Sequence, residues 1–290
     1  MLDKEGIKKY VVLYKEILSK RQIVVTDEDL DNIYHLILLT FDLDDLYDSL
    51  VGGAFPPENR SLDSLSAVGV SLPLGTADAT QTEPLRERSD ELEKIEQKMI
   101  SLMPDRQPIA LNSIALVFTA MEEEAHTDLS ESLTRYLSVC GKSIGAQLIT
   151  GYLASKNQIK LDIWLSPPIV KFNNEINDII RLANDYLDIT VDIKRVSEEV
   201  SQVKAVNFFR SKFEFKAYLY YRYVFHKIRY YIYAIGFRYL NIFSQRQDYL
   251  VAIECIESVL DFGVKAYIFD KKSFREPEKS RTIHQLPPLN

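Results

Sequence analysis

The chain has 290 residues, 46% hydrophobic and 27% charged, which is enough apolar material to bury a large core without covalent staples. Its net charge of −7 argues against a nucleic-acid binder, and its ten glycines form no G-x-G-x-x-G or P-loop pattern. Two cysteines are too few for a disulfide framework, and the first residues, MLDKEGIKKY, lack the apolar region of a signal peptide. No apolar run is long enough to span a membrane, so we expect a cytoplasmic protein.

The first third of the chain reads as two helices followed by a long loop. A helix over residues 2–20 is predicted by apolar residues that recur every three or four positions, at Ile7, Val11, Tyr14 and Leu18. Thr26 is a good N-cap for the second helix, because three acidic residues follow it at the positive helix end. Two glycines end this helix at about Val51. Residues 52–85 are rich in Gly, Pro, Ser and Thr, and we expect a flexible loop there.

The rest of the chain also has the pattern of helices. Ser89 is the expected N-cap of a helix that ends before Pro104, and the next helix begins at Pro108. Later helices are expected at 128–154, with an interruption near Gly141 and Gly145, and at 166–197, 200–243 and 245–267. Only residues 158–164 alternate like a strand. We therefore predict a single all-α domain over residues 1–290, a bundle of roughly ten helices with a flexible tail at 270–290.

Four aspartates stand together near the end of the second expected helix, in the segment FDLDDLYD at 41–48. Asp44 and Asp48 are four residues apart and share a helix face, and Asp45 lies beside them. Carboxylates at this density next to an apolar helix need a cation, and an oxygen-only ligand set suits Mg²⁺. The alternative is an acidic helix end in solvent, because a DDxxD string alone is a weak signal.

A second polar stripe lies in the helix expected from Pro167 onward. Asn184, Asp188 and Asp192 are spaced by four residues each and therefore share one helix face. Isoleucines and leucines surround the stripe, which argues against the alternative of a polar face in solvent. Three oxygen ligands over two helical turns predict a second cation site.

Together, DDLYD at 44–48 and RLANDYLDITVD at 181–192 resemble the class I terpene synthase family, particularly its microbial cyclases. That family carries a DDxxD motif and a later NDxx(S/T)xxxE motif, often preceded by Arg-Leu. The separation between Asp44 and Asn184 (184 − 44 = 140 residues) is similar to that of the family. The resemblance covers most of the chain and implies a helical bundle of the class I terpenoid synthase type, with the two motifs facing each other.

The resemblance implies a terpene synthase, a carbon–oxygen lyase that ionises a prenyl diphosphate such as farnesyl or geranylgeranyl diphosphate and releases diphosphate. It also implies three Mg²⁺ ions, with Mn²⁺ as an alternative, and no acid–base catalytic residue is assigned. The implied metal ligands are Asp44, Asp45 and Asp48 for two ions and Asn184, Asp188 and Asp192 for the third. The expected partner is this small molecule rather than a nucleic acid, and a homodimer is left open.

The chain departs from the family pattern at several positions. Asp188 and Asp192 stand where the family has Ser or Thr and Glu. The segment YLSVCGKSIG resembles the broken helix of the family, with Gly145 as the effector and Ile144 as the linker. Gly141 occupies the position of the diphosphate-sensing Arg, so Lys142 is its nearest substitute and Arg135 another candidate. The remaining predicted substrate-binding residues are Phe41, as a wall of the pocket, and the cations Lys194, Arg275 and Arg281.

Two other enzyme or protein classes stay open. A trans-prenyltransferase that condenses prenyl diphosphates would carry DDxxD twice, whereas the second motif here begins with Asn184. A non-catalytic helical protein on the same fold is the third hypothesis, because the sensor arginine is missing. A further stripe of Arg222, His226 and Arg229 is interpreted as a basic face that snorkels to solvent, with a diphosphate-facing stripe or an RNA surface as alternatives.

Overall fold

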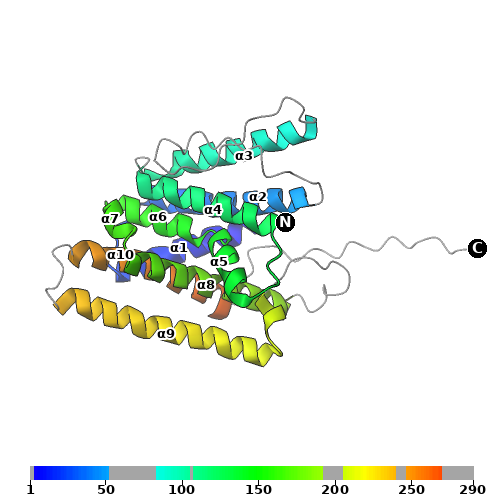
Figure 1. Ribbon diagram of the computed structural model, residues 1–290. Helices are drawn as coiled ribbons and strands as arrows, with labels where there is room; N and C mark the ends of the chain where they lie inside the picture. Colours follow the sequence, from blue (N-terminus) through cyan, green and yellow to red (C-terminus); the bar gives the residue numbers. More distant parts are fainter. Residues whose placement is uncertain (1–2, 52–82, 105–106, 192–204, 240–245, 270–290) are drawn as a thin grey trace, which may run out of the picture.

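The computed structural model describes residues 3–51, 83–104, 107–191, 205–239 and 246–269 (Figure 1). These residues form ten α-helices, one 3-10 turn and a final π-helical turn, and they contain no strand. The predicted all-α class is therefore confirmed at this level. The predicted loop, up to residue 82, and the predicted tail at 270–290 lie outside the described residues, as do Asp192, Lys194, Arg275 and Arg281.

The helices account for most of the described residues. Their bounds are α1 Lys4–Lys20, α2 Asp27–Val51, α3 Glu83–Leu102, α4 Pro108–His126, α5 Leu133–Ser143, α6 Ala146–Lys156, α7 Leu161–Trp164, α8 Pro167–Val191, α9 Lys212–Tyr239 and α10 Arg246–Val264. The 3-10 turn η3 covers Ala205–Phe208, and the π-helical turn η4 covers Lys265–Phe269. Among the described residues, no helix has the length and apolarity needed to cross a membrane.

The starts of the first two helices follow the sequence signals. Asp3 caps α1 by accepting a hydrogen bond from the Gly6 amide at 2.8 Å, and all four residues of the predicted apolar stripe are buried. Thr26 and Asp29 form a reciprocal capping box at α2: the Thr26 amide donates to Asp29 at 2.7 Å, and the Asp29 amide donates to the Thr26 hydroxyl at 3.1 Å. The predicted cap at Thr26 is therefore confirmed.

Three boundaries differ from the prediction. Helix α3 begins at Glu83, so Ser89 lies inside the helix; Pro84, in its first turn, is compatible with this earlier start. Helix α5 begins only at Leu133, because Ser132 caps it by accepting from the Arg135 amide at 3.1 Å. The alternating residues 158–164 form no strand, since the described chain offers no other strand to pair with, and α7 is a single helical turn there.

The helices pack in layers, with α3 at one edge of the bundle and α9 at the opposite edge (Figure 1). Helix α8 is central: it packs against α5, α10 and α9, and α10 packs in turn against α1 and α6. Helix α4 packs against α2, α5 and α6. The core is continuous across these contacts. Because α9 packs mainly against α8 and α10, its remaining side stays at the surface.

Candidate functional site

The first acidic motif and the described part of the second, up to residue 191, lie in the last turns of long helices. Helices α2 and α8 end at Val51 and Val191, on the same side of the bundle (Figure 1). Asp44 and Asn184 are half-buried, whereas Asp45 is exposed. The side chains of Asp48 and Asp188 belong to the part of the chain that the structure does not describe, and so does all of Asp192.

The metal ligands therefore stay a prediction. The described residues contain no group of three His, Cys, Asp or Glu side chains placed to hold a metal ion. Three of the six predicted ligands lie outside that search. The chemistry of the predicted set, carboxylate and amide oxygens without sulfur or imidazole, is that preferred by Mg²⁺.

The predicted helix break lies next to the first motif. Helix α5 ends at Ser143, and Gly145 adopts a left-handed conformation, with φ of 77°, before α6 begins. A Cβ atom at Gly145 would lie 2.5 Å from the Cγ2 atom of Thr40, which is one turn before Asp44 on α2. A side chain at this position would therefore be strained and also clash with α2. Ile144 and Phe41 are both partly buried against the core.

Gly141 does not interrupt the helix, contrary to the prediction. It lies inside α5 and faces α8 so closely that a Cβ atom would be 2.7 Å from the carboxylate of Asp178. Arg222 of α9 binds the same carboxylate at 2.7 Å. Burial raises the pKa of Asp178, while the bond from Arg222 and the charge of Lys142 oppose this rise. The position expected for a sensing arginine is thus filled by the contact between α5 and α8.

Arg181 and Asp185, from the second motif, belong to a buried cluster that joins α4, α5 and α8. Arg181 contacts Asp185 at 3.1 Å, Glu124 at 3.2 Å and the Tyr136 hydroxyl at 2.9 Å. Tyr136 donates to Asp185 at 2.7 Å. Burial alone would lower the pKa of Arg181, but its three acidic and phenolic neighbours raise it well above the usual value. These residues position α8 in the bundle. Asn184, a predicted metal ligand, directly precedes Asp185 in the chain.

Sequence reasoning missed most of this cluster. The four-residue spacing of Arg181 and Asp185 was a usable signal for their ion pair. No spacing pointed to Glu124 or Tyr136, which come from other helices. The amide of Ala205, beyond the undescribed residues 192–204, also donates to Asp185 at 3.0 Å. The cluster therefore links the end of α8, before residues 192–204, to the beginning of η3, after them.

The basic stripe on α9 faces the interior, so the expected snorkelling to solvent is wrong. His226 is buried and lies 2.8 Å from Glu257 and 3.4 Å from Glu175. Arg229 also pairs with Glu175. Together with the bond from Arg222 to α8, these contacts tie α9 to α8 and α10. Because each member has a carboxylate partner, the stripe gives no support to a free anion-binding or RNA surface.

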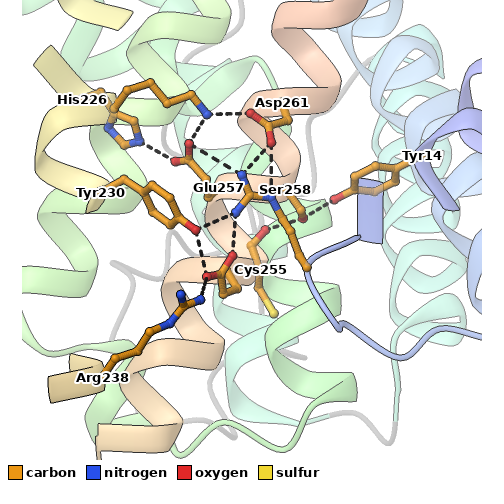
Figure 2. A network of polar contacts seen from close by, with 11 residues as sticks. Tyr14, His226, Tyr230, Arg238, Cys255, Glu257, Ser258 and Asp261 are labelled. Carbon is orange, nitrogen blue, oxygen red and sulfur yellow. Dashed lines mark hydrogen bonds and ion pairs between the residues drawn. The ribbon is translucent and has the colours of Figure 1, made fainter. Parts of the chain in front are cut away.

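A second charged network joins α1, α9 and α10 (Figure 2). Arg21 binds Glu254 at 2.5 Å and Asp261 at 2.6 Å, and Lys227 binds Asp261 at 2.6 Å. Glu257, which is fully buried, pairs with Lys227. Burial alone would lower the pKa of Arg21 and Lys227, but the neighbouring carboxylates raise both values.

A cavity of about 810 Å³ adjoins this network. It lies between α1, α9 and α10, and none of the predicted site residues lines it. Arg21, Arg238, Glu254 and Asp261 line it and are paired with one another in the network. Their charges therefore balance within the fold.

Comparisons with family models, with curated proteins and with solved structures found no match to this chain. The resemblance to the class I terpene synthases thus depends on the two acidic motifs and on the broken helix between them.

Proposed function

We propose that this chain is a Mg²⁺-dependent terpene synthase acting on a prenyl diphosphate. The observation that carries the proposal is the common placement of the two acidic motifs, in the last turns of α2 and α8, at one end of the bundle (Figure 1). The break between α5 and α6 adds support, because Gly145 packs against α2 one turn before Asp44.

The donor set fits the proposed ions. Residues 41–48 and 181–192 contain seven aspartates and one basic residue, Arg181, which is paired with Glu124 and Asp185. A cluster of this sign and hardness favours a divalent cation with oxygen ligands. Asp44, Asp45 and Asp48 would hold two ions and Asn184, Asp188 and Asp192 the third. When bound, Mg²⁺ supplies Lewis acidity that stabilises the diphosphate leaving group.

The chain's own side chains would bind and shield the substrate. Phe41, one turn before Asp44, offers an aromatic face that stabilises positive charge in the allyl group. Lys142 stands beside the break and is half-buried, so it is suited to orient one end of the diphosphate. Lys194, Arg275 and Arg281 are the other proposed contacts to phosphate oxygens.

A non-catalytic helical protein is the second candidate, and one observation favours it. Position 141 is crowded for an arginine, because a Cβ atom there would lie 2.7 Å from the carboxylate of Asp178, which would have to move away. Arg222 instead supplies the cation at that carboxylate, from α9. If the chain binds diphosphate, the binding cations must therefore differ from the sensing arginine of the family.

The decisive experiment incubates the purified protein with Mg²⁺ and, separately, geranyl, farnesyl and geranylgeranyl diphosphate. A cyclic or linear terpene, detected by gas chromatography with mass spectrometry, together with released diphosphate, is the expected result. Chelation with EDTA should abolish turnover, and added Mg²⁺ or Mn²⁺ should restore it. A longer prenyl diphosphate as product would assign a prenyltransferase, and absence of turnover with all three substrates would favour the non-catalytic candidate.

A further inference from the structure

The outward face of α9 is apolar over its central turns. Between residues 220 and 235, every exposed side chain is aromatic or a branched aliphatic: Tyr220, Tyr221, Val224, Phe225, Ile228, Tyr231, Ile232 and Ile235. Single exposed apolar residues are ordinary on a protein surface, but a contiguous group of this size marks an interaction surface. We call these eight residues the α9 face.

The α9 face carries no charge of its own. The three cations in the same stretch are paired with carboxylates of α8 and α10: Arg222 with Asp178, Lys227 with Asp261 and Arg229 with Glu175. Arg229 also lies over the Phe225 ring at 5.2 Å, and Lys216, one turn before the face, lies over the Tyr220 ring at 5.9 Å. A helix that lies on an anionic membrane surface keeps unpaired Lys and Arg along its apolar face. Here the exposed cations Lys216 and Arg238 stand only beyond the two ends of the face. The arrangement therefore favours an apolar protein partner over a lipid surface.

The α9 face is close to symmetric about Ile228. Tyr221 and Ile235 lie seven residues on either side of it, Val224 and Ile232 lie four, and Phe225 and Tyr231 lie three. We propose that this face is a homodimer interface, in which α9 of a second copy crosses antiparallel at Ile228. Seven of the eight side chains then meet an apolar one of the other copy, as a twofold, self-complementary contact requires, and Tyr220 would lie against Gly236.

The position and the exposed area of the α9 face are both suited to a second copy of the chain. Helix α9 forms one edge of the bundle, and its main helix contacts are with α8 and α10, so its outer side can be approached by another molecule (Figure 1). Most of the eight side chains are about half exposed, with 52% for Ile228 and 61% for Ile232. At about 100 Å² for each half-exposed large side chain, the face would bury roughly 800 Å² per copy, the size of a standard stable interface.

The first test measures the mass of the full chain by analytical ultracentrifugation over a range of concentrations. The wild type should sediment as two chains, and Ile228→Glu should raise the dissociation constant of the dimer at least a hundredfold, because two carboxylates would meet on the twofold axis. Val12→Glu, an exposed apolar position on α1, is the matched control and should remain dimeric. Equal melting temperatures of the two variants would show that Ile228→Glu folds.

A cysteine experiment tests the arrangement without destabilising charges. Ile228→Cys should form an intermolecular disulfide under mild oxidation, and the two native cysteines, Cys140 and Cys255, are buried and should not. A mixture of Tyr221→Cys and Ile235→Cys should give the mixed disulfide. Self-pairing of Tyr221→Cys would overturn the antiparallel arrangement. A wild-type chain that stays monomeric in sedimentation would overturn the proposed dimer. If this monomer also floats with phosphatidylcholine–phosphatidylglycerol vesicles, the α9 face binds lipid instead.

Discussion

Two groups of carboxylates in this chain differ in the sequence and the packing around them. In the α1–α9–α10 network, Glu254, Glu257 and Asp261 are surrounded by Arg21, Lys227 and Arg238. At the ends of α2 and α8, the first motif, residues 41–48, contains four aspartates and no basic residue, and the second, residues 181–192, contains three aspartates and one arginine, Arg181, which pairs with Asp185. A charge that the fold itself compensates holds helices together, whereas a run of closely spaced aspartates at a helix end is suited to an external ion.

The two groups also differ in burial. Glu257 is fully buried, and its charged neighbours are His226 and Lys227 of α9 and Arg21 at the end of α1. Asp45, in the first motif, is exposed. Neutralising a network carboxylate should therefore damage the fold, and neutralising a motif carboxylate should damage turnover while the fold persists. The predictions below test this contrast, beginning with the largest effect.

Glu257→Gln should lower the free energy of unfolding by about 3–5 kcal/mol, because it leaves buried cations without their full complement of negative charge. Urea denaturation followed by circular dichroism measures the loss. Asp45→Asn is the control in the other group and should change stability by less than about 0.5 kcal/mol. Equal losses in the two variants would contradict the structural distinction between network and motif.

Asp44→Asn should reduce turnover of the prenyl diphosphate about 100-fold, which corresponds to roughly 2.7 kcal/mol of transition-state stabilisation. The reason is that the proposed leaving-group stabilisation depends on the ions held by this carboxylate. Asp42→Asn, an exposed aspartate two residues earlier, is the matched control and should retain the wild-type rate. Steady-state kinetics at saturating Mg²⁺ would decide, and a fully active, folded Asp44→Asn variant would refute the ligand assignment.

Gly145→Ala should lower the free energy of unfolding by about 1–3 kcal/mol, since the left-handed backbone disfavours a side chain and its Cβ atom would press on Thr40. Gly236→Ala is the contrasting change: it lies in α9 with open space around it, and alanine should stabilise that helix by up to about 1 kcal/mol. Thermal unfolding of both variants measures the difference. A neutral Gly145→Ala would mean that the break is not held against α2.

The smallest effect concerns alkaline pH. Burial, together with the hydrogen bond to Glu254, raises the pKa of Tyr230 to about 12, above the value of 10.0 for an ordinary tyrosine. A raised pKa gives stability that is present below pH 10 and is lost as the pH rises through 12. Tyr230→Phe should therefore lose less stability than the wild type between pH 10 and 12, as measured by urea denaturation at each pH. If the free energy of unfolding falls with pH equally steeply in Tyr230→Phe and in the wild type, Tyr230 does not contribute to this pH dependence.

Local signals in the sequence predicted much of the helical framework. The apolar stripe of α1, the Thr26 cap and the proline starts of α4 and α8 are each determined by residues within a few positions, so they could be read directly. The interruption expected near Gly141 and Gly145 is found at Gly145, whose left-handed backbone only the structure shows. The start of α3 at Glu83 was missed, since Ser89 has the residue type of a cap without its position.

The direction of the charged side chains was decided only by tertiary structure. Arg21 and Asp261 are 240 residues apart, and no spacing in the chain links them. The basic stripe on α9 has the same pattern whether it faces solvent or carboxylates, and only the packing of α8 and α10 against it turns it inward. The sequence by itself therefore determines where helices form and which segments are acidic. Which charges are compensated depends on long-range packing, because ion pairs form between side chains that the fold brings close together in space, whatever their separation in sequence.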